Sequence, residues 1–165
     1  MAKESSFDVV SNVDLQEVDN AYQQAARELT QRYDLKQTGS TIDFSKRDET
    51  FSVSAPSEFV CGQVIDVLNS KLAKRGIDLT ALSWGDIQPA TGASVRRSGR
   101  LIQGIDKDTA KKIAKDIRDL KLKCKATVEG DKLRVSSASR DTLQQVIAHL
   151  KERDYGQPLQ FVNYR

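Results

Sequence analysis

The stretch Val13-Asp-Leu-Gln-Glu-Val18 has a counterpart 92 residues further along the chain, Ile105-Asp-Lys-Asp-Thr-Ala110. Each stretch follows a strand-like segment, residues 7–13 in one case and 100–105 in the other. Each also leads into a helical pattern, two short strands, a second helix and a further strand. A unit of about sixty residues repeated in tandem indicates two similar small domains, for which a chain of 165 residues has room.

The composition is that of an ordinary globular chain. Hydrophobic residues make up 38% of the sequence, and apolar runs are only a few residues long, far short of a membrane span. No apolar stretch follows Met1, so we expect no secretory signal. The two cysteines, Cys61 and Cys124, fall in different repeats and are expected to be buried, reduced thiols. We therefore expect a cytoplasmic protein without membrane contact.

The net charge of +3 conceals an asymmetry between the two halves of the chain. Residues 1–92 contain nine Lys/Arg and fourteen Asp/Glu, a balance of −5, whereas residues 93–165 contain seventeen and nine, a balance of +8. Such a division indicates either that the halves attract each other or that the second half contacts a polyanion.

In the first repeat, Asp14 has the character of a helix N-cap, and Glu17 three residues later fits a capping box. Residues 41–45 and 50–55 alternate between apolar and polar side chains, which predicts a hairpin with one buried face. A second helix is expected after Ser57.

The second repeat has the same order of elements. We expect a helix capped by Asp106, strands at 123–128 and 132–136, a helix after Ser139 and a last strand at 159–164. Between the repeats, residues 77–87 are expected to be extended or irregular, and residues 88–93 have the composition of a linker.

The order strand, helix, strand, strand, helix, strand is the split βαβ or ferredoxin-like arrangement of the α+β class. Its helices cover one face of a four-stranded antiparallel sheet and leave the other face open. RNA-recognition modules share this layout and place aromatic side chains on the open face. Phe44 and Phe51 are instead in phase with the core-facing residues, so the order of elements alone does not predict RNA binding.

Several segments spread over nearly the whole chain belong together as a set. They are Ser6-Phe-Asp-Val-Val-Ser-Asn-Val-Asp-Leu-Gln-Glu-Val-Asp-Asn20, Lys71-Leu-Ala-Lys-Arg-Gly-Ile77, Gln103-Gly-Ile105, Ser139-Arg-Asp-Thr-Leu-Gln-Gln145 and Gln157-Pro-Leu-Gln-Phe-Val-Asn-Tyr164. As a set they resemble the YajQ family of small bacterial proteins. The sequence departs from the family pattern at Ile102, where a Lys is usual, and at Ser98-Gly-Arg100, which is usually more strand-like.

The resemblance implies two tandem ferredoxin-like domains that exchange their first strands. The strand near residues 95–105 would then complete the first domain, residues 14–105. The strand at residues 6–13 would complete the second domain, residues 106–165. The resemblance also implies binding of a nucleotide or nucleic acid, with RNA or a cyclic dinucleotide signal as the ligand.

Cations gather in the second repeat in a pattern that suits phosphate binding. At about 100° per residue, the cations of the helix after Asp106 share one quadrant, away from its apolar side. Lys125 and Arg134 of the following hairpin are expected on the open face of the sheet, where a cation can neutralise a phosphate. The expected binding residues are Lys111, Lys115, Arg118, Lys123, Lys125 and Arg134. The alternative is a solvated basic surface, whose charge is diluted by Asp108, Asp116 and Asp119.

Little in the sequence indicates catalysis. His149 is the only histidine, and its place near the end of the last helix suits a structural or surface role. One histidine and two distant cysteines do not predict a zinc site, and the dinucleotide, P-loop and nucleophile-elbow motifs are absent. Trp84 is expected to cover the core rather than to stack on a base.

The sequence thus predicts a binding protein that is not an enzyme and that needs no cofactor and no metal. The alternative is a protein-interaction adaptor that uses the open sheet faces or edges. A nucleotide hydrolase is a third hypothesis.

Overall fold

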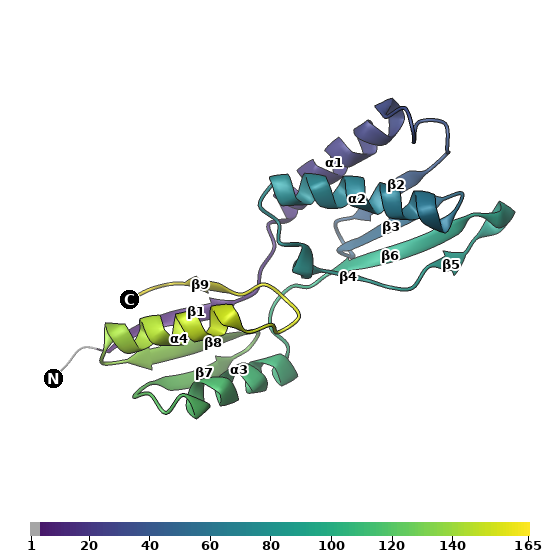
Figure 1. Ribbon diagram of the computed structural model, residues 1–165. Coiled ribbons are helices and arrows are strands. Elements are labelled where there is room, and N and C mark those ends of the chain that lie inside the picture. Colours follow the sequence, from purple (N-terminus) through teal and green to yellow (C-terminus); the bar gives the residue numbers. More distant parts are fainter. Residues whose placement is uncertain (1–3) are drawn as a thin grey trace. The chain divides into compact units, whose positions relative to one another are not determined.

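The chain forms two compact α+β units. In the computed structural model, which describes residues 4–165, the first unit consists of Val13–Ile102 and the second of Met1–Asn12 with Gln103–Arg165. The chain passes between the units twice, after Asn12 and after Ile102. Each unit has an antiparallel sheet and two α-helices (Figure 1), so the predicted fold class of two tandem ferredoxin-like domains is confirmed.

In the first unit, two helices cover one face of the sheet. The elements are α1 (Leu15–Gln31), β2 (Thr41–Ser45), β3 (Thr50–Ala55), α2 (Glu58–Lys74), a 3-10 turn (Leu79–Ala81), β4 (Leu82–Trp84), β5 (Gln88–Pro89), a second 3-10 turn (Thr91–Ala93) and β6 (Val95–Leu101). The strand order is β2-β3-β6-β4, and β5 also pairs with β6. Phe51 and Val53 of β3 are fully buried in a core that includes Leu68 of α2.

The second unit repeats this arrangement. Its elements are β1 (Ser5–Val10), α3 (Lys107–Asp119), β7 (Lys125–Glu129), β8 (Lys132–Ser137), α4 (Arg140–Glu152) and β9 (Gln160–Val162), with the strand order β7-β8-β1-β9. Phe7 and Val9 of β1 are fully buried against Ile113 of α3 and Val146 of α4.

One central strand of each sheet belongs by sequence to the other repeat. β1 lies between β8 and β9, with Phe7 opposite Val135. β6 lies between β3 and β4, with Gly99 opposite Phe51. The first strands of the two repeats are therefore exchanged, as the family resemblance implied.

Helices α1 and α3 begin where the repeated aspartates predict. Asp14 accepts hydrogen bonds from the N–H groups of Gln16 and Glu17 at 3.0 and 3.3 Å. Asp106 accepts one from the N–H of Thr109 at 2.8 Å. These caps satisfy amide groups that have no partner within the helix, so the sequence repeat corresponds to one local structure used twice.

The segment between the repeats differs from its expected structure. β6 ends at Leu101, so only Arg100 and Leu101 of the strand expected at residues 100–105 are in a strand, and Gly104 in the remaining stretch has a φ of 78°. A side chain at Gly104 would meet Asp131 at 2.9 Å, so the turn requires glycine. Residues 88–93 are not a free linker either, because β5 pairs with β6.

The exchange predicts which unit each strand stabilises. Phe7→Ala removes a fully buried ring and should lower the free energy of unfolding of the second unit by about 3–5 kcal/mol. Hydrogen exchange measured by mass spectrometry should then become faster in β7 and β8, while β2 and β3 stay protected. Leu101→Ala in β6 is the matched change and should give the reverse pattern. Faster exchange in β2 and β3 after Phe7→Ala would contradict the exchange of strands.

Candidate nucleic-acid interface

The open face of the second sheet presents alternate residues of its strands. Leu133 and Val135 of β8 are fully buried in the core, so Arg134 between them lies on the open face. Thr127 of β7 is opposite Arg134 and shares this face with Lys125, the first residue of β7. The sheet therefore holds Lys125 and Arg134 on one surface.

A buried carboxylate lies on this open face, between the strands. Asp8 of β1 is opposite Arg134 and only 2% exposed. Arg134 Nε donates to one oxygen of Asp8 at 3.2 Å, and Lys132 Nζ and Asn163 Nδ2 donate to the other at 3.4 and 2.8 Å. Arg134 also lies 3.9 Å from Glu129. Because its charge is already matched within the fold, Arg134 is a weaker candidate for phosphate binding than an unpaired cation.

The ion cluster keeps Asp8 charged although it is buried. Burial by itself raises the pKa of Asp8, because the carboxylate loses hydration. The hydrogen bonds from Asn163 and Arg134, together with the positive charge of Lys132, outweigh this effect and bring the pKa of Asp8 below its ordinary value. The carboxylate is therefore ionised at neutral pH and holds both cations in place.

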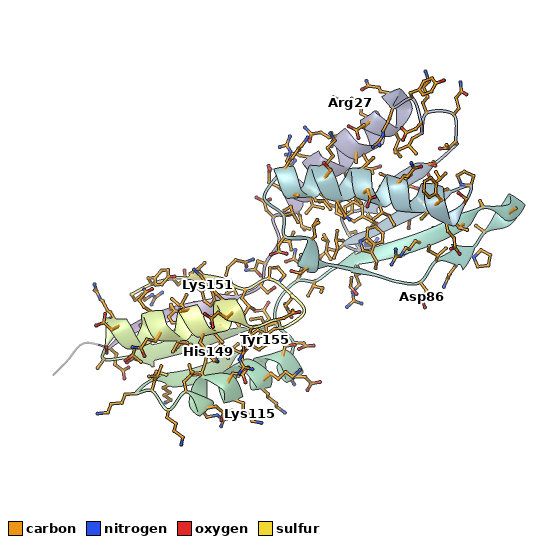
Figure 2. All side chains as sticks on the ribbon, in the orientation of Figure 1. Arg27, Asp86, Lys115, His149, Lys151 and Tyr155 are labelled. Atoms are coloured by element: carbon orange, nitrogen blue, oxygen red, sulfur yellow. The ribbon has the colours of Figure 1, made fainter. Side chains whose placement is uncertain are left out.

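The other cations of the predicted set lie around the β7 edge of the second unit. They are Lys111, Lys115 and Arg118 on α3, Lys123 before β7 and Lys125 at its start, all exposed. None of these five forms an ion pair with another residue of the described range 4–165. Helix α3 packs chiefly against β7, an edge strand, and Figure 2 shows Lys115 on the outer side of that helix.

The predicted residues therefore do not share a single flat face. Helix α3 covers one face of the sheet, and Lys125 lies on the other. Three of the five unpaired cations lie on α3, which packs on the edge strand β7, and the other two lie just before and at the start of β7, so we call them the β7-edge cations.

Sequence reasoning missed a second polar surface, on the open face of the first sheet. Arg96 and Arg100 of β6 are exposed there and form no ion pair within residues 4–165. The register surrounds them with small hydroxyl side chains, which are Thr41, Ser45, Thr50, Ser52, Ser54, Ser83 and Ser98. The sequence pattern that could have indicated this surface is the alternation of the polar residues Arg96, Ser98 and Arg100, which predicts a strand only if these residues face solvent.

The exchange of strands also redistributes charge. The first unit contains eleven Lys/Arg and twelve Asp/Glu, a net charge of −1, and the second contains fifteen and eleven, a net charge of +4. The contrast is smaller than between the halves of the sequence, mainly because Arg96, Arg97 and Arg100 belong to the first unit. The second unit remains the more positive of the two.

His149 belongs to a polar cluster that links α4 to α3, and Figure 2 labels two of its members, His149 and Tyr155. Arg153 Nε donates to His149 Nε2 at 3.1 Å, and Arg153 lies 3.6 Å from the carboxylate of Asp116 on α3. Tyr155 donates its hydroxyl to Asp116 at 2.6 Å. Burial and this hydrogen bond raise the pKa of Tyr155 well above its ordinary value. These contacts give His149 a structural role in fastening the two helices.

The two thiols differ in exposure. Cys61 is fully buried in the first unit, whereas Cys124 is only half-buried in the second, contrary to the expectation of two buried thiols. Burial raises the pKa of both, which lowers the fraction of reactive thiolate. Within residues 4–165, no three His, Cys, Asp or Glu side chains gather as a metal site requires. None of the described helices is long and apolar enough to cross a membrane.

The fold and its surface define a class of protein, in which two small ferredoxin-like units exchange strands and direct unpaired cations to solvent. Over residues 5–165 the chain matches the model of the family described as nucleotide-binding protein YajQ-like. The chain belongs to this family, which confirms the resemblance seen in the sequence.

Relatives align with the chain along their whole length. Proteins named nucleotide-binding protein from Chloroherpeton thalassium and Alkaliphilus oremlandii are each 48% identical to it over 165 residues, which is 100% of both chains. A protein of the same name from Desulfitobacterium hafniense is 46% identical, again over 100% of both chains.

The buried carboxylate predicts a pH-dependent contribution to stability. Asp8→Asn keeps the size of the side chain and removes its charge, so the free energy of unfolding at pH 7 should fall by about 1–3 kcal/mol. An aspartate whose pKa is lowered by folding stabilises the fold above its unfolded pKa of about 3.9, and this contribution is lost as the pH falls through the folded pKa. The free energies of unfolding of parent and variant should therefore approach each other as the pH falls from about 4 through the folded pKa.

Asp43→Asn is the matched control, because Asp43 lies exposed on the open face of the first sheet. It should change the free energy of unfolding by less than about 0.5 kcal/mol. Equal effects of the two substitutions would show that the Asp8 cluster does not stabilise the fold.

The polar cluster at His149 predicts a loss of stability without a loss of binding. Tyr155→Phe removes the hydroxyl that donates to Asp116 and should lower the free energy of unfolding by about 1 kcal/mol. Tyr33→Phe, at a ring that is 88% exposed, should have no measurable effect. His149→Ala should leave nucleic-acid affinity within about twofold, because the half-buried imidazole contacts Arg153 in the structural cluster and is not one of the candidate phosphate ligands. A large loss of affinity in His149→Ala would assign the histidine to the site.

Proposed function

We propose that the chain binds a nucleotide or nucleic acid through its phosphate groups, without catalysing a reaction, and that the β7-edge cations of the second unit are its ligands. The observation that supports this most directly is that all five are exposed and unpaired within residues 4–165. Cations in this state release the counterions of a polyanion when they neutralise its phosphates, which favours association. The name of the relatives, nucleotide-binding protein, supports the class of ligand.

The arrangement of the cations favours an extended ligand. Lys111 and Arg118 are separated by about 10 Å along the axis of α3, and Lys123 and Lys125 follow in the chain, where the edge strand β7 begins. Because the charges follow an edge instead of lining one hollow, we propose a strand of RNA as the ligand. A cyclic dinucleotide, with two phosphates, would engage only some of these cations.

Within this proposal Arg134 supports the site indirectly. Its pairing with Asp8 holds β8 to β1, and so fixes the open face on which Lys125 lies. The proposal requires no cofactor and no metal, and it assigns the activity to the cytoplasm.

The proposal predicts salt-dependent binding. In fluorescence anisotropy with a labelled single-stranded RNA, log Kd should rise linearly with log salt, with a slope of about 0.7 per neutralised phosphate. The double change Lys115→Gln with Lys125→Gln should weaken binding and reduce that slope by about 1.4. Both side chains are exposed, so the fold should be unaffected.

Two further pairs locate the surface. Lys46→Gln with Lys74→Gln removes two cations from the first unit and should leave binding unchanged. Arg96→Gln with Arg100→Gln tests the hydroxyl-lined face of the first sheet, the competing surface for the same ligand. Salt-independent binding, or equal losses from all three pairs, would contradict the proposal and favour the adaptor hypothesis. If a cyclic dinucleotide at equal concentration displaced the RNA completely, the cyclic dinucleotide and not RNA would be the proposed ligand.

A further inference from the structure

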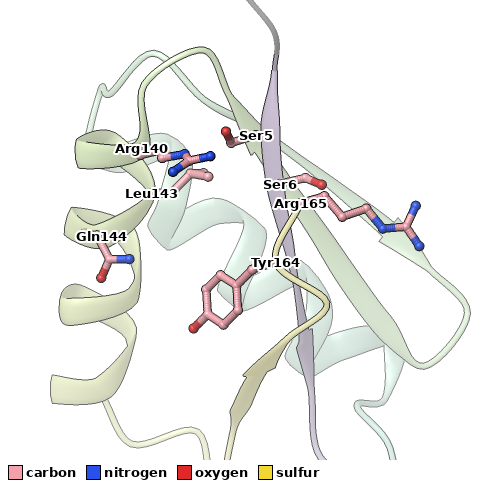
Figure 3. A pocket seen from close by; sticks show the side chains of 7 residues that line it. All are labelled: Ser5, Ser6, Arg140, Leu143, Gln144, Tyr164 and Arg165. Atoms are coloured by element: carbon pink, nitrogen blue, oxygen red, sulfur yellow. The ribbon is translucent and has the colours of Figure 1, made fainter.

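A pocket of about 290 Å³ lies in the second unit, between the start of α4 and the start of β1 (Figure 3). Arg140, Leu143 and Gln144 line it from the helix, Ser5 from the strand and Tyr164 from the segment after β9. Leu143 is 4% exposed and gives the pocket an apolar wall, whereas the Tyr164 ring is 60% exposed. None of the β7-edge cations lines this pocket.

A one-residue irregularity of the sheet places Tyr164 in the pocket. Asp8 is opposite Val162, so regular antiparallel pairing would put Ser6 opposite Tyr164. Instead Ser6 exchanges both backbone hydrogen bonds with Arg165, at 3.1 and 2.9 Å. The extra residue is a β-bulge, which turns Tyr164 toward the helix side, where its ring centroid lies 6.1 Å from that of Phe7.

The Asp8 cluster stabilises this bulge. Asn163 takes the left-handed conformation, with a φ of 58°, which few residues other than glycine and asparagine adopt without strain. Its Nδ2 donates to the buried carboxylate of Asp8 at 2.8 Å. Asp8 is held in turn by Lys132 and Arg134, so the ion cluster acts as a positioning device for the Tyr164 ring.

The groups around the pocket match the parts of a nucleotide. An exposed aromatic ring offers a stacking surface to a base, and the amide of Gln144 can both donate to and accept from a base edge. Arg140 is the first residue of α4 and forms no ion pair within residues 4–165, so its guanidinium and the positive helix end suit a phosphate. In Figure 3, Arg140 and Tyr164 both lie between α4 and β1.

We infer that this pocket binds one nucleoside monophosphate unit, with the base against Tyr164 and the phosphate at Arg140. The pocket volume lies near the lower end of the range for small-molecule sites, which suits a single unit and not a dinucleotide. The inference rests on the proposed function for its class of ligand, but it assigns a separate site. The unit is either a free nucleotide or the phosphorylated end of a strand.

The test uses the full chain, labelled with ¹⁵N and titrated with adenosine and guanosine 5′-monophosphate and with inorganic phosphate. Amide shifts should centre on residues 140–144 and on Ser5, Ser6 and Tyr164. Tyr164→Leu and Arg140→Gln should each weaken nucleotide binding about tenfold. Tyr33→Leu and Arg27→Gln are the matched controls, since both side chains are exposed in the first unit, and they should change affinity by less than twofold.

Two outcomes would overturn the inference. If the pocket variants leave nucleotide binding unchanged, the nucleotide binds elsewhere. If inorganic phosphate shifts the same amides and binds as tightly as a nucleotide, the base does not contribute to binding. The failure of this inference is distinguishable from that of the proposed function. If the pocket amides do not respond while RNA still binds with the predicted salt dependence, only the pocket is disproved. If nucleotides bind in the pocket while Lys115→Gln with Lys125→Gln leaves RNA binding intact, only the β7-edge cations are disproved.

A pair of RNA oligonucleotides of one sequence identifies the source of the nucleotide unit. If the pocket takes a strand end, a 5′-phosphorylated oligonucleotide should bind more tightly than its 5′-hydroxyl counterpart, and Arg140→Gln should abolish the difference. If the pocket takes a free nucleotide, the two oligonucleotides should bind alike while adenosine or guanosine monophosphate still shifts the pocket amides.

Discussion

The pairing of β1 with β8 and β9 is the interaction on which the second unit depends. It places Phe7 and Val9 in the core beneath α3 and α4, and it closes a sheet that would otherwise lack a central strand. Because side chains alternate along a strand, the same pairing brings Asp8 onto the opposite face, beside Arg134. One short segment therefore supplies both an apolar core and a buried counter-charge.

That counter-charge divides the cations of the second unit into two kinds. Lys132 and Arg134 are held by Asp8, and a phosphate that bound them would have to compete with a carboxylate that cannot regain water. Lys115 and Lys125 have no such partner within residues 4–165 and lose little by contacting a phosphate. The physical distinction between a structural and a ligand-binding cation here is whether folding has already neutralised it.

The helices and hairpins of both units could be predicted because they follow from local periodicity and capping. The strand β6 could not be placed from local periodicity, since two of its core-side positions lack apolar side chains, and only the family resemblance placed a strand near residues 95–105. Gly99 is there because the ring of Trp84 lies where a Cβ would be, at 2.7 Å. Arg97 donates to the carbonyl of Gly85 at 2.7 Å and lies over the same ring. Trp84 packs against the core, as expected, and its ring fills the space that an apolar side chain at position 99 would occupy, so β6 lacks the apolar alternation of a core strand.

The candidate site shows the same limit of local information. A period of two is enough to place Lys125 and Arg134 on one face, but the partner of Arg134 lies 126 residues away, on a strand that the repeat pattern assigns to the other domain. The bulge at Asn163 is equally hidden, because its stabilising contact with Asp8 spans 155 residues. Long-range register decides which charges are neutralised and which aromatic rings face a pocket. A count of cations along the sequence therefore overestimates those available to a ligand. It also misses the pocket that Arg140 and Tyr164 line together, which depends on the pairing of β1 with β9.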